Sequence, residues 1–208
     1  LDGSAYTTTG TQTYKGATGG SNIVISGTAP TFTTTNTAIA FNTSDVTLSN
    51  NGTTTINTGS GAGGVTFGAK VETNGGGNDN LTITSGEGNV TFTGSVGAGN
   101  SLGALSVNAS SGDGDITFSS TIGDSDSAGT SGTTAIGNDA TEVIYFNNTL
   151  YSFDGGQTTI TAKDGLNTRI TQADTTIKVN GEALRFDESA LSLSSGANLT
   201  INSNGGAI

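Results

Sequence analysis

Short apolar triplets recur along the chain at a nearly constant spacing. Val65-Thr66-Phe67, Val90-Thr91-Phe92 and Ile116-Thr117-Phe118 follow one another at intervals of roughly 25 residues. A weaker copy, Ile39-Ala40-Phe41, precedes Val65 by a similar interval. A repeat of this length is typical of stacked structural units, each too small to bury its own apolar face.

Each repeat contains two further apolar segments. The second lies six positions after the first, as Val71 follows Val65, and the third lies further along the same repeat, as in Leu81-Thr82-Ile83. In most triplets two apolar residues flank a small hydroxyl residue, and successive side chains on a strand point to opposite faces. Three short strands per repeat, separated by Gly, Asn, Asp and Ser, predict one coil of a β-solenoid.

The pattern therefore predicts an all-β solenoid, a right-handed parallel β-helix of roughly 25 residues per coil and about eight coils, with residues 1–208 forming a single domain. Helices are not expected, because apolar residues rarely recur at helical spacing and β-branched residues are abundant. The inward positions should form one core column, made of Val65, Phe67, Val71, Leu81, Ile83, Val90, Phe92, Val96, Leu105, Val107, Ile116, Phe118 and Ile122.

Two regions depart from this rhythm. Residues 123–137 are rich in Gly, Ser, Asp and Thr, which predicts an inserted, exposed loop. Residues 157–186 are predicted to form irregular coils, because Leu184 follows Ile170 at little more than half the usual interval. An inserted hairpin or a coil decorated with charged side chains would both account for this spacing.

Composition fits a thin core better than a compact globule. The hydrophobic fraction is 31%, against about 45–50% in average soluble proteins when Gly is included. A solenoid needs less apolar material, because each coil contacts only its neighbours. Disorder would also fit the 34 Gly residues, but the single Pro, the 11% charged residues and the periodic apolar positions argue against it.

The charge balance excludes some partners. Six basic and 17 acidic residues give a net charge of −11. Nucleic acid and anionic membranes are not expected as partners, because their phosphates need clustered Lys and Arg. No apolar run is long enough to suggest membrane insertion, and no Cys reports on the redox compartment. Because Leu1 is not an initiator Met, we expect a segment of a longer chain.

Two segments carry a family resemblance. Thr7–Ala17 has the order Thr-Thr-Thr-Gly-Thr-Gln-Thr-Tyr-Lys-Gly-Ala, and Gly88–Val96 repeats Gly-Asn-Val-Thr-Phe-Thr-Gly-Ser-Val. Together they resemble the repeat region of filamentous haemagglutinin-like exoproteins, which are bacterial two-partner-secretion adhesins. The resemblance covers roughly residues 7–125. It implies a right-handed parallel β-helix that is exported to the cell surface.

Few residues of the chain could act in enzymatic catalysis. The chain contains no His and no Cys, so no Ser–His or Cys–His nucleophile is available. Lys163, Asp164 and Arg169 are the best charged set, but a polysaccharide-cleaving site needs several such groups converging on one groove. We therefore predict no catalytic residues and no enzyme.

One segment approaches a calcium motif. Asn74–Leu81 is close to the Gly-Gly-x-Gly-x-Asp-x-apolar repeat of calcium-binding β-rolls, with Asp79 as the candidate metal ligand. A lone copy supplies too few oxygens for an ion that takes six to eight. A Gly-rich turn before a strand is the preferred interpretation, and calcium is the only cofactor kept as an alternative.

The hydroxyl residues of the triplets, Thr66, Thr82, Thr91 and Thr117, should face outward. Stacked about 4.8 Å apart, they would form a ladder that supports neighbouring coils. A flat threonine array could also bind ice or a polysaccharide, but each triplet offers one outward position, and Ala40 and Ser106 interrupt the row. The structural ladder is preferred.

These observations predict a non-enzymatic stalk or filament segment of a secreted or cell-surface bacterial adhesin. Its partners would be neighbouring coils of the same or identical chains, and a host or matrix glycan or protein. The alternatives are a carbohydrate- or ice-binding solenoid module and a filament subunit that stacks on itself.

Overall fold

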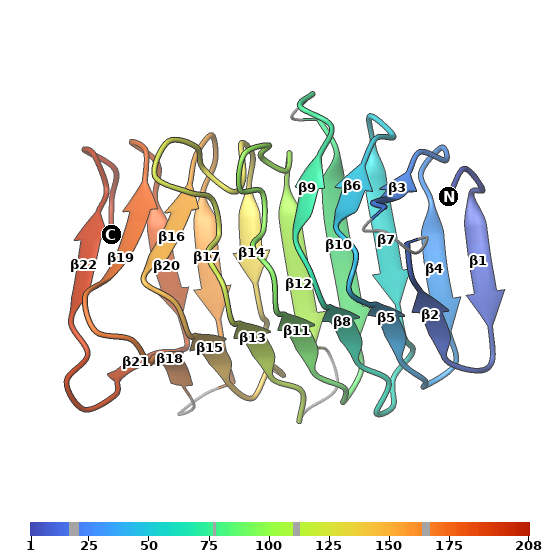
Figure 1. The fold of residues 1–208 in the computed structure, drawn as a ribbon. Helices are drawn as coiled ribbons and strands as arrows, with labels where there is room; N and C mark the ends of the chain where they lie inside the picture. The colour runs from blue at the N-terminus through green and yellow to red at the C-terminus, as the bar shows by residue number, and fades with distance from the viewer. Residues whose placement is uncertain (17–20, 77, 110–112, 164–166) are drawn as a thin grey trace.

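Strands stacked in parallel form the whole described part of the molecule. The structure, a computed structural model, describes residues 1–16, 21–76, 78–109, 113–163 and 167–208. This part contains 22 strands and no helix. The strands form a parallel β-solenoid with roughly 26 residues per turn, which confirms the predicted fold class, and it has about seven turns where about eight were expected. Figure 1 shows the strands stacked from the N-terminal to the C-terminal end.

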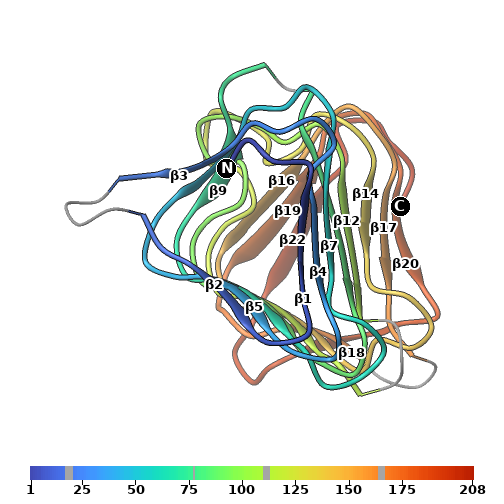
Figure 2. The same cartoon turned by 90° about the vertical axis from the view of Figure 1, so that its right-hand side faces the viewer.

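The strands of the solenoid lie on three faces, here called sheets A, B and C (Figure 2). Sheet A stacks β1 (Ala5–Thr8), β4 (Thr31–Thr34), β7 (Thr53–Asn57), β10 (Asn80–Ser85), β12 (Leu105–Ala109), β14 (Thr134–Ile136), β17 (Thr158–Thr161) and β20 (Leu184–Asp187). Sheet B stacks β2 (Gln12–Tyr14), β5 (Ile39–Phe41), β8 (Val65–Phe67), β11 (Val90–Phe92), β13 (Ile116–Phe118), β15 (Ile144–Phe146), β18 (Asn167–Ile170) and β21 (Ala190–Leu193).

Sheet C is divided into two three-stranded parts. The first contains β3 (Ile23–Ile25), β6 (Val46–Leu48) and β9 (Val71–Thr73), and the second contains β16 (Leu150–Phe153), β19 (Thr175–Val179) and β22 (Leu199–Asn202). Single parallel bridges from Val71 to Val96, from Val96 to Ile122 and from Ile122 to Tyr151 connect them. This face is therefore the least regular of the three.

The triplets that repeat in the sequence pair with one another in sheet B. Val90 pairs with Val65 on one side and with Ile116 on the other. Backbone hydrogen bonds hold the coils together, as when Val65 N donates to Asn89 O at 2.9 Å and Val90 N donates to Asp115 O at 2.8 Å. Homologous positions of successive coils thus lie directly on one another.

The core is a continuous column inside the three sheets. Every residue predicted to form it is at most 1% exposed. Its most regular part is a stack of Phe rings with centroids 5.0–5.6 Å apart and interplanar angles of at most 10°. The stack comprises Phe41, Phe67, Phe92, Phe118 and Phe146. At the N-terminal end Tyr14 continues it, stacked on Phe41 at 5.0 Å.

The prediction that residues 123–137 form an exposed loop is wrong for their second half. Thr130 is fully buried and bridges to Leu102 and Phe153, and β14 lies in sheet A between β12 and β17. The inward positions here include Thr, and the Thr130 and Thr134 hydroxyls lie 2.9 Å apart. A hydropathy pattern misses such a coil because its inward side chains are polar but satisfy each other.

Residues 157–186 are more regular than their spacing suggests. The described strands β17, β18, β19 and β20 all pair in parallel with strands of neighbouring coils, so the inserted-hairpin hypothesis is wrong. Leu184 does not begin a coil in sheet B. It pairs with Thr158 in sheet A, and buried Thr168 takes the expected inward apolar position of sheet B.

Replacing Phe92 by Asp should lower the free energy of unfolding by at least about 4 kcal/mol, because the aromatic packing is lost and a charge is buried without a partner. Thr91→Asp is the matched control, since Thr91 lies in the same strand and is only partly buried. Urea unfolding followed by circular dichroism measures both variants. Equal midpoints for Phe92→Asp and the parent chain would contradict the inward position of Phe92.

Candidate functional site

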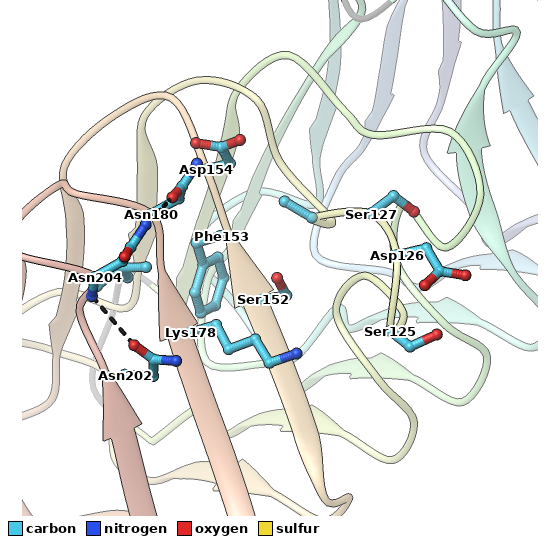
Figure 3. A pocket seen from close by; sticks show the side chains of 12 residues that line it. Ser125, Asp126, Ser127, Ser152, Phe153, Asp154, Lys178, Asn180, Asn202 and Asn204 are labelled. Atoms are coloured by element: carbon cyan, nitrogen blue, oxygen red, sulfur yellow. Dashed lines mark hydrogen bonds between the residues drawn. The ribbon is translucent and has the colours of Figure 1, made fainter.

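A polar groove lies on the outer face of the second part of sheet C. It has a volume of about 390 Å³ and lies between a short loop and the strands β16, β19 and β22. Figure 3 shows Lys178 pointing from the sheet toward the loop that carries Ser125 and Asp126. Its lining residues are Ser125, Asp126, Ser127, Ala128, Ser152, Phe153, Asp154, Lys178, Val179, Asn180, Asn202 and Asn204.

The loop wall of the groove is organised by Asp124. Its Oδ1 accepts hydrogen bonds from Asp126 N at 2.9 Å, from Ser127 N at 2.7 Å and from Ser127 Oγ at 2.9 Å. These donors favour the ionised carboxylate and hold the pKa of Asp124 below its ordinary value. Beyond the loop, Gly129 N donates to Ser152 O at 2.8 Å, which ties the wall to sheet C.

The floor of the groove consists of side chains repeated from coil to coil. Ser152 pairs with Lys178, and Lys178 pairs with Asn202, so their outward side chains form one row. A second row contains Asn180 and Asn204, whose Nδ2 donates to Asn180 Oδ1 at 2.7 Å. The floor is therefore a small lattice of amide, hydroxyl and charged groups.

Charges of both signs line this groove. The Lys178 ammonium makes no hydrogen bond or ion pair with any residue that the structure describes, and neither do the carboxylates of Asp126 and Asp154. The apolar lining residues Phe153 and Val179 are only 2% and 1% exposed. The accessible surface of the groove thus offers unpaired hydrogen-bonding groups beside a smaller apolar part, to which the half-buried Ala128 contributes.

Asp79, the calcium candidate, has a structural role instead. Its side chain is 1% exposed, and its Oδ1 accepts hydrogen bonds from Asn50 N and Asn51 N, both at 2.6 Å. The carboxylate thereby anchors the turn of the preceding coil, where Asn51 has a positive φ of 51°. Gly77, within the candidate motif, lies outside the described residues. Among those described, no three His, Cys, Asp or Glu side chains gather as a metal site would require.

The charged set Lys163, Asp164 and Arg169 does not form a site in the described structure. Asp164 lies outside the described residues, Lys163 is exposed, and the Arg169 guanidinium lies 5.7 Å from the centroid of the Tyr145 ring. Cation–π contact is the evident role of Arg169. Nearby, burial and the negative charge of Glu142 raise the pKa of Asp115 above its ordinary value.

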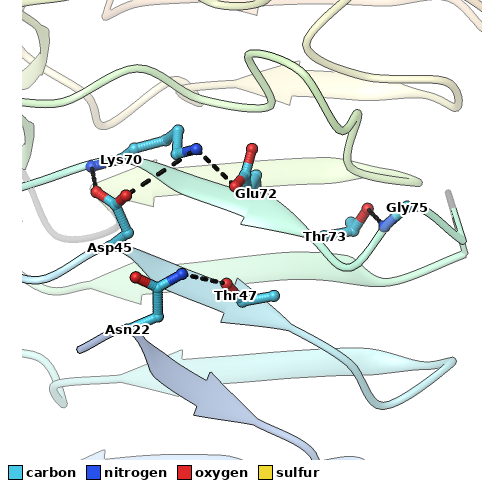
Figure 4. A network of polar contacts seen from close by, with 7 residues as sticks. All are labelled: Asn22, Asp45, Thr47, Lys70, Glu72, Thr73 and Gly75. Carbon is cyan, nitrogen blue, oxygen red and sulfur yellow. Dashed lines mark hydrogen bonds and ion pairs between the residues drawn. The ribbon is translucent and has the colours of Figure 1, made fainter. Parts of the chain in front are cut away.

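An ion-pair cluster that the sequence reasoning missed lies on the first part of sheet C (Figure 4). Lys70 Nζ lies 2.6 Å from Glu72 Oε1 and 4.0 Å from Asp45 Oδ2, and Lys70 N donates to Asp45 Oδ1 at 3.2 Å. Glu72 is only 8% exposed. The sequence could have indicated this cluster, because Lys70 and Glu72 flank Val71 and residues two apart on a strand face the same side. The cluster joins adjacent coils and pairs the Lys70 charge with two carboxylates.

The four Thr residues predicted as one outward row lie on two sheets. Thr66, Thr91 and Thr117 stack in register in sheet B, whereas Thr82 lies in sheet A between Thr55 and Ser106. The expectation of one outward position per strand is also wrong for sheet A, whose strands are longer. There Thr82 and Thr84 both face outward from the six-residue strand β10.

The outer face of sheet A therefore carries two rows of small polar side chains. The paired outward positions of successive coils are Thr31 and Thr33, Thr55 and Asn57, Thr82 and Thr84, Ser106 and Asn108, and Thr159 and Thr161, with Ala135 between the last two coils. Charge enters these rows only in β20, where Arg185 and Asp187 form an ion pair at 3.5 Å.

Comparisons with family models, with curated proteins and with solved structures found no significant match to this chain. The residues that the structure describes include no helix that is long and apolar enough to cross a membrane.

Replacing Asp79 by Ala should lower the free energy of unfolding by about 1–3 kcal/mol, because two amide groups of the Asn50–Asn51 turn lose their acceptor. The loss should be the same in EDTA and in calcium, as measured by thermal or urea unfolding. Asp113→Ala, at an exposed carboxylate, is the matched control. A loss seen only in calcium would instead assign a metal to Asp79.

Proposed function

We propose that the chain is a non-enzymatic structural rod, a stalk or filament segment of a secreted or cell-surface bacterial adhesin. The observation that carries the proposal is the unbroken parallel pairing of eight strands in sheet A and of eight in sheet B. Such stacking holds the two ends of the molecule apart at a fixed distance. A spacer needs this property and needs no reactive group.

The pairing also favours durability outside the cell. Backbone amides of one coil donate to carbonyls of the next along the sheets, as in Ile116 N to Val143 O at 2.9 Å. Paired amides in a packed core open rarely, which limits access for proteases. The cell-surface and adhesin parts of the proposal are supported by the resemblance of Gly88–Val96 to exported adhesin repeats.

Three of the described carboxylates are used in a way that favours a structural role over catalysis. Asp79 and Asp124 accept hydrogen bonds from backbone amides, and Asp45 accepts one while facing Lys70. Groups engaged in this way hold turns together and are poorly placed to exchange protons with a substrate. Their chemistry is that of structural anchors.

The rod proposal predicts that whole coils can be removed. Deleting residues 65–89 joins Gly64 to Val90, which occupies the same register position as Val65. The shortened chain should fold with the same circular dichroism spectrum. Its longest dimension in small-angle X-ray scattering should fall by about 4.8 Å, and by twice that when residues 65–115 are deleted.

Deletion of residues 65–76 is the control, because it removes about half a coil and leaves too few residues between β7 and β10 to complete the turn that pairs them. This variant should not fold. Equal behaviour of the half-coil and whole-coil deletions would contradict the rod, and turnover of a polysaccharide by the intact chain would contradict a non-enzymatic role.

A second candidate function, binding to ice, rests on the two polar rows of sheet A. Their side chains are uncharged from β4 to β17, and they repeat about 4.8 Å apart along the solenoid axis. A regular array of small polar side chains suits a regular ligand surface. The interruption by Ala135 and Gly137 divides the array.

The ice-binding candidate predicts that Thr82→Tyr with Thr84→Tyr abolishes thermal hysteresis, because the two rings would stand above the flat face. Thr66→Tyr with Thr91→Tyr, on sheet B, is the matched control and should leave thermal hysteresis unchanged. Absence of thermal hysteresis and ice shaping in the intact chain would rule this candidate out.

A further inference from the structure

The groove on sheet C differs from the charged cluster on the first part of the same sheet. There, the partly buried Lys70 is paired with Glu72 at 2.6 Å. In the groove Lys178 is partly buried and the carboxylates of Asp126 and Asp154 line the same space, with no hydrogen bond or ion pair to the described residues. Unpaired charged groups gathered in one groove add nothing to the stacking of a rod. Their arrangement is instead suited to a polar ligand.

We propose that this groove binds a neutral oligosaccharide lying along the solenoid axis across β16, β19 and β22. Sugar hydroxyls both donate and accept hydrogen bonds, and the groove offers both kinds of partner: the Lys178 ammonium and the Asn180 and Asn202 amides donate, and Asp126 and Asp154 accept. The volume of about 390 Å³ lies within the usual range of small-ligand sites.

The lining disfavours other ligand classes. Lipids are held mainly by apolar contact, and the large apolar side chains here, Phe153 and Val179, are almost fully buried beneath the polar rows, which leaves only the half-buried Ala128 accessible. Polyanions are disfavoured because Lys178 is the only cation among the described lining residues, shares the groove with Asp126 and Asp154, and belongs to a chain of net charge −11.

The asparagine amides of the floor and the backbone of the loop wall are held in place before any ligand arrives. Asn204 Nδ2 donates to Asn180 Oδ1 at 2.7 Å, so the Nδ2 hydrogens of Asn180 point away from Asn204 and remain available as donors. Asn202 Oδ1 accepts from Asn204 N at 3.2 Å, so its amide hydrogens remain available. On the opposite wall Asp124 fixes the loop through Asp126 N and Ser127 N. Preorganisation reduces the entropy lost on binding.

The row spacing determines the orientation of the ligand. Ser152, Lys178 and Asn202 come from three successive coils, about 4.8 Å apart along the axis. A linear sugar chain along this axis would pass Lys178 and Asn202 in turn and end near Ser152, which is 9% exposed. The groove therefore suits a linear oligosaccharide.

The test begins with the intact chain on an array of neutral cello-, xylo-, chito- and galacto-oligosaccharides, followed by calorimetric titration with the best binder. Lys178→Met should weaken binding at least tenfold, because a charged donor is lost while its aliphatic stem is kept. Lys163→Met removes the same charge from an exposed position outside the groove and should leave the affinity unchanged.

A second matched pair covers the loop wall. Asp126→Asn should weaken binding, whereas Asp113→Asn, at an exposed site on another coil, should not. Unchanged melting temperatures would show that all four variants fold. No bound neutral sugar, equal affinity of Lys178→Met and the parent, or binding of acidic sugars alone would overturn the proposal. None of these results would change the scattering dimensions that test the rod.

Discussion

The structure depends on register between successive coils. Parallel pairing places each residue on its counterpart one turn away, so a core position must pack against copies of itself. Val65, Val90 and Ile116 do so in sheet B, and the Phe residues two places further on form a column of stacked rings. A shift by one residue would turn these side chains to solvent. The hydrophobic effect and the hydrogen bonds therefore enforce the same alignment.

The same constraint explains how polar residues are used. Asn and Asp side chains at the turns accept hydrogen bonds from backbone amides of adjacent coils, as Asp79 does from Asn50 and Asn51 and as Asn89 Oδ1 does from Asp115 N at 2.9 Å. Coils also approach closely at these turns. A Cβ on Gly88 would lie 2.3 Å from the carbonyl carbon of Gly63, so only glycine fits there.

The irregular parts of the solenoid lie on the face formed by sheet C, beside the groove. Sheets A and B each form a continuous ladder of eight strands, but sheet C is reduced to single bridges at Val96 and Ile122, and the loop organised by Asp124 stands beside it. The next strands, β16 and β19, carry polar side chains against this loop. The regular faces thus supply length and stiffness, and the irregular face supplies the groove.

The sequence by itself determined the repeat, the strand positions of the clearest coils and the core column, because an apolar position that recurs each turn must lie inside a stack. It could not predict β14, whose inward Thr134 is satisfied by Thr130, since that bond forms only after the coil closes. Nor could it assign Leu184 to sheet A, because turns of unequal length change which face a strand joins. The role of Asp79 and the convergence of Lys178 with Asp126 were decided by the tertiary structure, because coiling brings together groups that lie one or more turns apart along the chain.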